Sequence, residues 1–191
     1  SIDNLSSGNY IIQVIDNTNC IITDTIFVDE PSQLVLSTSQ ISNSCYGYSD
    51  GQLNVQVSGG NPPYSYNWNT IPPQNSSNAV YVSAGNYLVT VSDINSCIDT
   101  SSQSVYQPSA VPVNISSSNT TVCFGGSVNL TASGALSYNW SPSIWLSSTN
   151  SSNVISTPNT SIDYIVTGTD INGCSNNDTV SVSVVQSLSM S

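Results

Sequence analysis

The sequence predicts an all-β protein in which small β-sandwich domains follow one another in an extended array. Apolar residues alternate with polar ones at Leu53, Val55 and Val57, and no stretch shows the periodicity of a helix. Turn-forming residues gather between such stretches at intervals of roughly ten residues, a spacing typical of β-sandwiches. Similar segments also end in cysteines at positions 20, 97 and 174, separated by the same offset of 77, so the chain contains an internal repeat.

The repeat is clearest between residues 5–36 and 82–113, which align without a gap and share twelve identical residues. Prolines at positions 31 and 108 stand where one repeat would end and the next begin, and proline stiffens such a hinge. We therefore expect four parts. They are the C-terminal part of a truncated repeat (1–33), a complete β-sandwich repeat (34–109), a second β-sandwich (110–187) and a tail (188–191).

Each β-sandwich is expected to contain six strands, separated by clusters of Gly, Pro, Asn, Asp and Ser that favour turns. In the complete repeat we place the strands near residues 33–39, 52–58, 64–69, 78–83, 86–92 and 99–106. In the second sandwich we place them near residues 111–116, 127–133, 136–140, 152–157, 162–169 and 178–185.

The charge of the chain excludes several classes of partner. It has 191 residues without a lysine, arginine or histidine, and eleven acidic residues give it a net charge of −11. Without cations it cannot neutralise phosphates, so we expect no nucleic-acid partner and no attraction to anionic lipid. No apolar run reaches the roughly 18 residues that span a membrane, so direct membrane insertion is not expected.

The same absences argue against an enzyme. Without histidine or lysine the chain has no imidazole base and no amine nucleophile. A hydrolase built on two carboxylates is the remaining alternative, but no pair of acidic residues stands out as an acid and its partner. We therefore expect no catalytic site and no required cofactor.

The excess of carboxylates also bears on stability. Because no cation offsets them, their mutual repulsion should on balance raise their pKa values on folding, so stability is not expected to fall on mild acidification. Aspartates that cap turns would act in the opposite direction.

The five cysteines suggest disulfides in a secreted chain. Cys45 and Cys97 lie 52 positions apart, Cys123 and Cys174 lie 51 apart, and a tryptophan stands between the members of each pair, as in immunoglobulin domains. We expect the bridges Cys45–Cys97 and Cys123–Cys174, each closing one end of a sandwich. Cys20 is expected to have no partner in this chain, because repeat spacing places its mate ahead of Ser1. Free buried thiols or a metal site are the alternatives.

The tyrosine and aspartate of the recurring segment suggest structural roles. Tyr87 opens a strand after a turn and can return its hydroxyl to nearby backbone, as in the tyrosine corner of sandwich folds. A ligand contact is the alternative for this side chain. The sequences DINS and DING are turns in which the Asp or Asn side chain accepts hydrogen bonds from its own backbone.

Residues 43–108 resemble the SprB-type repeat. The letters that carry this resemblance are C-x-G-x-x-D-G from Cys45 to Gly51, VSGGNPPYSY-x-W from Val57 to Trp68, AGNY-x-V-x-V-x-D-x-x-x-C from Ala84 to Cys97, and a closing Gln107-Pro108. Ser96 stands where a glycine is usual. Residues 1–33 resemble the end of another such repeat, and residues 110–187 resemble the Ig-like or PKD-like modules that accompany these repeats.

The resemblance implies a place for the chain and a set of partners. SprB-type repeats occur in giant surface adhesins associated with gliding motility in Bacteroidetes, so an extracellular location at the cell surface is implied. Neighbouring repeats of the same parent chain would be the direct partners, with surface glycans or like filaments as further candidates. The implied fold is a tandem of small Ig-like β-sandwich domains.

Two kinds of site are candidates. Asp93 with Asn95, and Asp170 with Asn172, resemble the start of a calcium loop, although the later bidentate acid is absent and a hairpin turn is the simpler reading. Bound Ca²⁺ would be the only cofactor. Thr25 and Thr179 each follow an aspartate and precede an aliphatic residue, the O-glycosylation pattern of Bacteroidetes that the resemblance implies.

Aromatic residues offer one more candidate site. Tyr46, Tyr48, Tyr64 and Trp145 could form a platform on which sugars stack, if they share one face; packing within loops is the alternative. The function expected overall is a structural stalk or spacer segment of a large extracellular adhesin or filament. The alternative is a carbohydrate-binding or accessory module of a secreted multidomain hydrolase.

Overall fold

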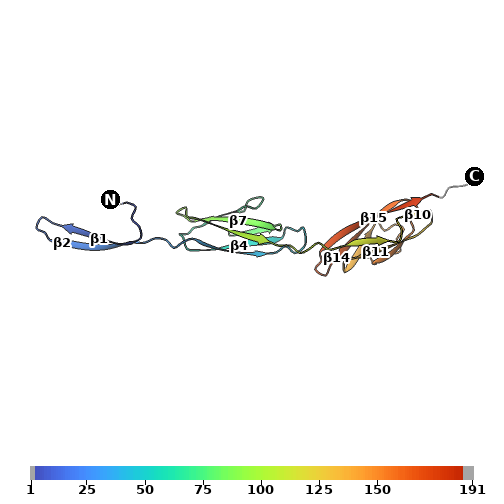
Figure 1. The fold of residues 1–191 in the computed structure, drawn as a ribbon, viewed down its shortest axis with the longest axis horizontal. Helices are drawn as coiled ribbons and strands as arrows, with labels where there is room; N and C mark the ends of the chain where they lie inside the picture. The colour runs from blue at the N-terminus through green and yellow to red at the C-terminus, as the bar shows by residue number, and fades with distance from the viewer. Residues whose placement is uncertain (1–2, 187–191) are drawn as a thin grey trace, which may run out of the picture. The chain divides into compact units, whose positions relative to one another are not determined.

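The computed structural model describes residues 3–186, and these residues form fifteen strands and no helix (Figure 1). The predicted all-β class is therefore confirmed. Since the described part of the chain lacks helices, it contains none that is long and apolar enough to cross a membrane.

The strands follow the predicted order closely. The hairpin at the start of the chain comprises β1 (Gly8–Ile15) and β2 (Ile21–Val28). The next six are β3 (Val35–Ile41), β4 (Gly51–Ser58), β5 (Ser65–Trp68), β6 (Asn78–Val82), β7 (Gly85–Ser92) and β8 (Ile98–Val105). The last seven are β9 (Asn114–Ser117), β10 (Thr121–Cys123), β11 (Val128–Ser133), β12 (Ser137–Ser141), β13 (Asn153–Ser156), β14 (Ile162–Thr169) and β15 (Ser175–Val185).

Among the thirteen strands from β3 to β15, only β10 was not predicted; β1 and β2 lie in residues 1–33, for which no strands were placed. It has three residues, too few to show an alternating pattern, and it pairs in parallel with the end of β15, where Cys123 lies opposite Val185. The twelve predicted strands all form, with ends displaced by three residues at most.

The strands form five small sheets. Hairpin β1–β2 is a sheet by itself, and the middle of the chain forms the sheets β3-β4-β6 and β5-β7-β8. The last part forms a sheet in the order β13-β11-β9 and another in the order β10-β15-β14-β12. Pairs such as β14 with β15 are antiparallel, so short turns connect them.

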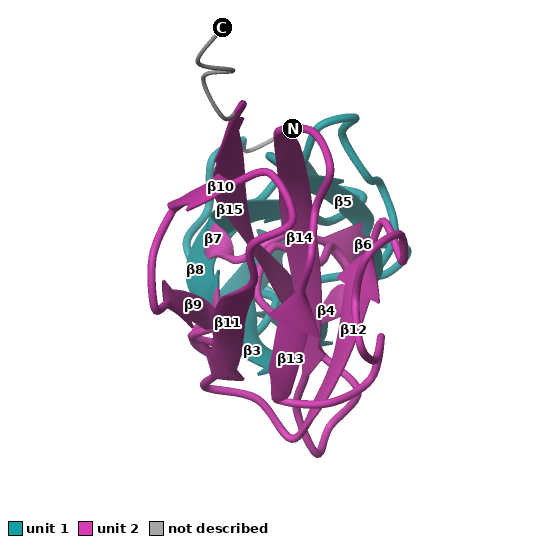
Figure 2. Cartoon of the chain, turned by 90° about the vertical axis from the view of Figure 1, so that its right-hand side faces the viewer, with its two compact units in different colours: residues 1–40, 53–80, 86–104 teal, residues 41–52, 81–85, 105–191 magenta. Residues whose placement is uncertain are grey.

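The chain divides into two compact units (Figure 2). Unit 1 comprises residues 1–40, 53–80 and 86–104, and unit 2 comprises residues 41–52, 81–85 and 105–191. These units are defined by the proximity of residues rather than by the repeat. The boundaries predicted after residues 33 and 109 therefore stay a prediction.

Unit 2 is built around one continuous hydrophobic core. Both of its last sheets contribute, because Leu130 of β11 and Val166 of β14 belong to the same cluster and neither is exposed to solvent. The core residues alternate along each strand, so polar residues point outward from the same strands. Trp140 is buried in this core and its indole N–H donates to the carbonyl of Ser151 at 2.9 Å.

Unit 1 repeats the same arrangement around its own tryptophan. Trp68 is fully buried, and its indole N–H donates to the carbonyl of Ser76 at 3.0 Å. Val89 and Val91 of β7 are buried completely, as the period of two requires. A tryptophan at the end of a short strand, tied back to the following loop, is thus common to both units.

Hairpin β1–β2 has the alternating apolar pattern of a strand pair that packs on a core, but its apolar residues are exposed. Ile12 and Val14 are the counterparts of Val89 and Val91 at the repeat offset of 77, yet they are 47% and 62% exposed. The register pairs Gly8 with Val28 and every residue between, so the hairpin itself is fully formed. The apolar face of this hairpin is therefore exposed, whereas the equivalent face of β7 is buried.

Two tyrosines of the recurring segment donate their hydroxyls to backbone carbonyls, while the role predicted for Tyr87 stays a prediction. In β1 the hydroxyl of Tyr10 donates to the carbonyl of Ser6, four residues earlier, at 2.8 Å. Tyr164 of β14 is fully buried, and its hydroxyl donates to the carbonyl of Ile144 at 2.9 Å. The same hydroxyl also shares a hydrogen bond of 2.8 Å with the hydroxyl of Ser156. Burial raises the pKa of Tyr164, an effect that this hydroxyl partly offsets.

One turn recurs three times, at Asp16, Asp93 and Asp170. In each, Oδ1 of the aspartate accepts the backbone N–H groups of the residues two and four positions later, at 2.8–2.9 Å. The backbone N–H of each aspartate also donates to the carbonyl of the residue four positions later, at 2.9–3.1 Å. The predicted role of the aspartate as a turn cap is therefore confirmed. The residue four positions later is a cysteine in all three turns, so the turn also sets the position of that cysteine.

The residue before the cysteine has a left-handed backbone in all three turns. Its φ angle is 61° at Asn19, 66° at Ser96 and 83° at Gly173. Asparagine and glycine tolerate this region well, whereas a serine there is strained by its Cβ atom. A glycine at position 96 would avoid this strain, as Gly173 does in the equivalent turn.

These hydrogen bonds lower the pKa values of two of the aspartates. The pKa of Asp93 is lowered chiefly by the N–H of Asn61, which donates to Oδ2 at 2.9 Å, and then by the turn amides, while burial acts against them. The pKa of Asp16 is lowered chiefly by the hydroxyl of Thr18. The general rise expected from carboxylate repulsion does not hold at these positions, because donated hydrogen bonds outweigh it.

Replacing Ser96 by glycine should stabilise the protein. Glycine adopts a φ of 66° without the steric cost of a Cβ atom, and part of that gain is offset by the larger backbone entropy of glycine when unfolded. We expect Ser96→Gly to raise the free energy of unfolding by about 0.5–1 kcal/mol in denaturant titrations. Gly173→Ser, the reverse change at the equivalent position, should lower it. A Ser96→Gly protein that is no more stable would contradict this account.

Stability should fall on acidification below pH 5. A lowered folded pKa means that the unfolded chain, whose aspartates titrate near pH 3.9, binds more protons as the pH falls, so the folded state loses stability from about pH 5 downward. Thermal unfolding in chelator should show little change from pH 7 to 5 and a drop from pH 5 to 3. Asp93→Asn should reduce that drop, and Asp163→Asn, which removes an exposed charge on β14, should preserve it. A melting temperature that rises below pH 5 would refute the assignment.

Candidate functional site

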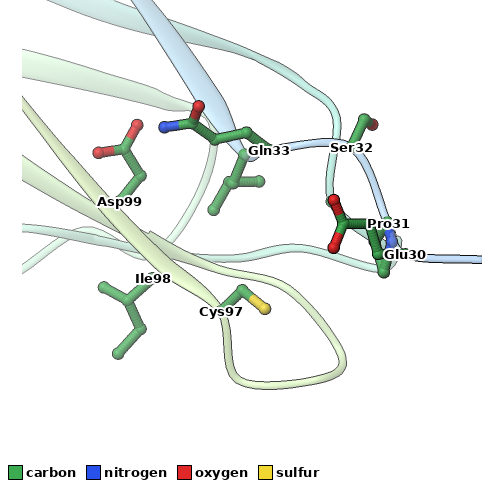
Figure 3. A pocket seen from close by; sticks show the side chains of 9 residues that line it. Glu30, Pro31, Ser32, Gln33, Cys97, Ile98 and Asp99 are labelled. Atoms are coloured by element: carbon green, nitrogen blue, oxygen red, sulfur yellow. The ribbon is translucent and has the colours of Figure 1, made fainter. Parts of the chain in front are cut away.

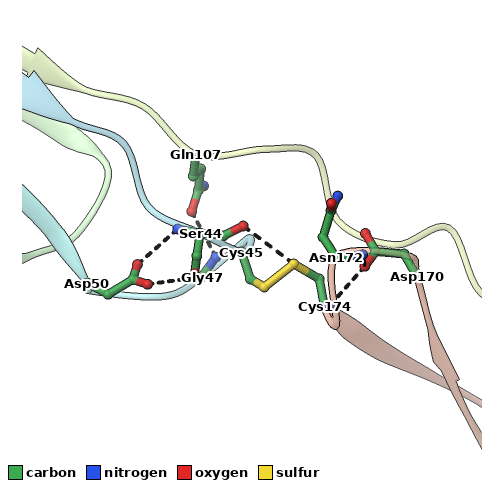
Figure 4. Close-up of a disulfide and its surroundings, with 8 residues drawn as sticks. All are labelled: Ser44, Cys45, Gly47, Asp50, Gln107, Asp170, Asn172 and Cys174. Atoms are coloured by element: carbon green, nitrogen blue, oxygen red, sulfur yellow. Dashed lines mark hydrogen bonds between the residues drawn. A yellow bond between two sulfur atoms is a disulfide. The ribbon is translucent and has the colours of Figure 1, made fainter.

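The described part of the chain contains one disulfide, and it is not one of the predicted pairs. Cys45 is bridged to Cys174, with sulfur atoms 2.02 Å apart and Cα atoms 5.5 Å apart (Figure 4). The bridges predicted between Cys45 and Cys97, and between Cys123 and Cys174, are wrong. Cys20, Cys97 and Cys123 carry free, exposed thiols.

The geometry of β15 explains why Cys123 and Cys174 cannot pair. Cys174 directly precedes the first residue of β15, whereas Cys123 lies opposite Val185, the last residue of that strand. Eleven residues of strand at roughly 3.3 Å each separate the two cysteines by more than about 30 Å. Disulfides require Cα atoms within about 7 Å.

The complete repeat has the same order of parts. Cys97 directly precedes β8, and the segment that carries Cys45 is tied to the residues after β8. The N–H of Asn43 donates to the carbonyl of Tyr106 at 2.8 Å, and the N–H of Gly47 donates to Oε1 of Gln107 at 2.8 Å. The loop cysteine therefore lies beside the C-terminal end of the last long strand of its repeat, and the turn cysteine directly precedes the N-terminal end of that strand.

Local hydrogen bonds hold the loop of Cys45 in shape. Oδ1 and Oδ2 of Asp50 accept the backbone N–H and the hydroxyl of Ser44, at 3.0 and 2.5 Å (Figure 4). The pKa of Asp50 is lowered chiefly by that hydroxyl and then by that N–H. Oδ1 of Asn43 accepts the N–H of Gly51 at 2.5 Å, while its Nδ2 atom is buried without a partner among the described residues. The cysteine is thus presented by a pre-formed loop.

The other half of the bridge comes from the recurring turn. Oδ1 of Asp170 accepts the N–H groups of Asn172 and Cys174 at 2.9 Å each. The Sγ atom of Cys174 lies 3.4 Å from the carbonyl oxygen of Ser44, a contact rather than a hydrogen bond because a bridged sulfur carries no proton. Turn and loop therefore meet at the disulfide.

A small cleft lies beside the disulfide. It has a volume of about 120 Å³ and is lined by Cys45, Tyr46, residues 109–111 and residues 174–176. The side chain of Asn176 donates from Nδ2 to the carbonyl of Val111 at 2.8 Å, which ties the incoming linker to the start of β15. We call this the bridged cleft.

A larger cleft lies at Cys97 in unit 1. It has a volume of about 370 Å³ and is lined by residues 30–34, Gly60 and residues 97–99 (Figure 3). Its linker is held by the carbonyl of Ser32, which accepts the N–H of Gly60 at 2.7 Å. A Cβ atom on Gly59 would lie 1.9 Å from the carbonyl oxygen of Gln33, so only glycine allows this close approach. We call this the Cys97 cleft.

The calcium candidates serve as turn caps. Oδ1 of Asp93 accepts two amides and Oδ2 accepts a third, and Oδ1 of Asp170 accepts two. Asn95 and Asn172 contribute their backbone N–H groups to these turns. Among the described residues no group of three or more His, Cys, Asp or Glu side chains is arranged to hold a metal ion.

The two threonine candidates lie in strands. Thr25 lies in β2 and Thr179 in β15, and the backbone N–H of each donates to the carboxylate of the preceding aspartate at 2.8 Å. Oδ2 of Asp178 also accepts the N–H of Ile115 at 2.7 Å. Both threonines are exposed, and their O-glycosylation stays a prediction.

The aromatic candidates differ in their surroundings. Tyr46 and Tyr48 are 57% and 50% exposed on the loop of Cys45. Tyr64 is partly buried and donates its hydroxyl to the carbonyl of Gly59 at 2.7 Å, a packing role. Trp145 is partly buried, and its carbonyl accepts the N–H of Thr157.

Alkylation of the unreduced protein should modify three cysteines. Cys20, Cys97 and Cys123 are free and exposed, whereas Cys45 and Cys174 are bridged, so an intact mass should show three added groups. Cys97→Ser should lower the number to two, and Cys174→Ser should raise it to four by freeing Cys45. One modified cysteine in the unchanged chain would instead support the pairing predicted from the sequence.

Several solved structures are similar to the chain at low scores. Murine CEACAM1b is similar over 79% of this chain and 100% of that chain, with 12% identity and a TM-score of 0.32. A Ca²⁺-stabilized adhesin that helps an Antarctic bacterium bind ice is similar over 94% of this chain and 57% of that chain, with 13% identity and a TM-score of 0.35. PcdhgB3 EC1-4 is similar over 97% of this chain and 66% of that chain, with 6% identity and a TM-score of 0.38. These scores are too low to carry an argument about function.

Sequence comparison gives a more specific result. No curated protein sequence matches the chain significantly. The profile of the SprB repeat family, in contrast, matches residues 37–72, which run from β3 past the buried Trp68. The resemblance predicted from the sequence is therefore confirmed for this segment: residues 37–72 match the SprB repeat family.

Proposed function

We propose that the chain is a structural stalk or spacer segment of a large extracellular adhesin or filament at the cell surface. The observation that carries this proposal is the SprB repeat at residues 37–72, in a chain whose Asp-x-x-x-Cys turn recurs at a constant offset of 77. Repetition of one small β unit builds length rather than an active site, because each unit contacts only its neighbours.

The disulfide supports the extracellular location. Disulfides persist in oxidising compartments and are rare in the cytosol. The bridge between Cys45 and Cys174 closes a loop over 129 positions, which contributes roughly 5 kcal/mol in the chain-entropy model. A stalk exposed to mechanical load and proteases gains from such a bridge.

The charge supports the proposed partners. With a net charge of −11 and no cation, the surface repels nucleic acid and anionic membranes, so neighbouring repeats of the parent chain are the direct partners we propose. Like filaments or surface glycans are further partners. The finer proposal, a gliding-associated adhesin of Bacteroidetes, rests on the resemblance to SprB-type repeats alone.

A second candidate is a carbohydrate-binding or accessory module of a secreted hydrolase. The exposure of Tyr46 and Tyr48 on one loop favours it, because exposed aromatic rings can stack on sugars. A glycan array separates the two functions. The spacer should bind no glycan, whereas binding that is lost in Tyr48→Ala and kept in Tyr48→Phe would favour the module.

A spacer should be longer than a globule of the same mass. A compact chain of 191 residues has a radius of gyration of roughly 16 Å. We expect small-angle scattering to give a clearly larger value, because separate repeats joined by proline-containing linkers do not collapse onto one another. A radius of gyration equal to that of the compact chain, together with glycan binding, would favour the second candidate over the spacer.

A further inference from the structure

The Cys97 cleft and the bridged cleft are the same feature at two places in the repeat. An offset of 77 relates residues 97–99 of the first to residues 174–176 of the second, and the linker residues 32–34 to residues 109–111. In both, a linker passes beside the turn that ends in cysteine. The clefts differ in what else lines them.

The bridged cleft contains an additional loop. Cys45 and Tyr46 form part of its wall, and Cys45 is bound to the turn cysteine. Among the described residues, none from such a loop lines the Cys97 cleft, which is about 370 Å³ in volume instead of about 120 Å³. Its cysteine is exposed and unbridged (Figure 3).

The loop itself is a recurring element with a defined shape. Cys45 and Cys123 are each followed by an aromatic residue and then a glycine, at φ 75° for Gly47 and 79° for Gly125. The carbonyl of each cysteine accepts the N–H three residues later, at 3.2 and 2.8 Å. Both loops lie beside the end of their repeat, since Phe124 donates its N–H to the carbonyl of Val185 at 3.0 Å.

We propose that the Cys97 cleft is the docking site for the Cys-aromatic-Gly loop of the repeat that precedes it, and that the cysteine of that loop forms a disulfide with Cys97. The occupant is inferred from the bridged cleft, where this loop occupies the equivalent place within the same chain. The disulfides of the array then link each repeat to the next instead of closing each repeat on itself. This inference deepens the proposed function, on which it rests, because it names how successive repeats are joined.

The chemistry of the bridge requires an oxidant. The two thiols lose two protons and two electrons as the S–S bond forms, and glutathione disulfide takes them up to become two molecules of glutathione. An exposed thiol such as that of Cys97 is accessible to this exchange.

A grafted repeat tests the proposal. Residues 34–81 are placed ahead of Leu5, in place of residues 1–4, and the rest of the chain is kept. The grafted cysteine then lies 129 positions before Cys97, the separation of the observed bridge, and 52 positions before Cys20. The graft carries Tyr46→Phe, so that its peptide differs in mass from the native loop; phenylalanine stands at this place in the loop of Cys123.

The two bridging schemes give different peptides. After oxidation with glutathione disulfide and digestion with pepsin, we expect a linked peptide of the grafted cysteine with Cys97, and a fall from three free thiols to two. The same graft with its cysteine replaced by serine should keep three. A link from the grafted cysteine to Cys20, or a free grafted cysteine in molecules whose Cys45–Cys174 bridge has formed, would overturn the proposal. Neither result would alter the scattering test of the spacer function.

Discussion

The hydrogen bonds from backbone amides to the aspartate of each Asp-x-x-x-Cys turn are the interaction on which the rest of the account depends. They close the hairpins β1–β2, β7–β8 and β14–β15, and they place a cysteine at the first position after each turn. At Asp93 the same carboxylate also accepts the N–H of Asn61, so the turn is joined to the loop after β4. One side chain thereby sets strand register, loop position and the location of a thiol.

Much of the fold could be predicted because its signals are local. Alternation along β4, β7 and β14 identifies strands, since one face of each is buried, and the aspartate turns are specified within five residues. Two features could not be predicted from the sequence. Strand β10 is too short to alternate, and its pairing with β15 depends on residues about 60 positions away. The exposed face of β1 carries the same pattern as the buried face of β7, because pattern reports what a strand can bury and not whether a partner is present.

The components of the candidate site were predicted correctly, but the pairing of its cysteines was not. Sequence identified all five cysteines, the capped turns and the repeat offset of 77, and analogy with immunoglobulin domains then suggested pairing within each sandwich. That analogy fails because the turn cysteine stands before the last long strand of a repeat and the loop cysteine beside its end, as β15 shows for Cys174 and Cys123. The separation of 129 positions between Cys45 and Cys174 equals one intra-repeat spacing of 52 plus one repeat offset of 77, a signal that the sequence contained.

The bridge between Cys45 and Cys174 joins the loop cysteine of one repeat to the turn cysteine of the next. Peptide mapping of the unreduced chain tests it most directly. Because the chain has no lysine or arginine, pepsin or chymotrypsin must replace trypsin for the digestion. The account predicts one linked pair of peptides, containing Cys45 and Cys174, which separates on reduction. Peptides that link Cys45 to Cys97, or Cys123 to Cys174, would contradict it.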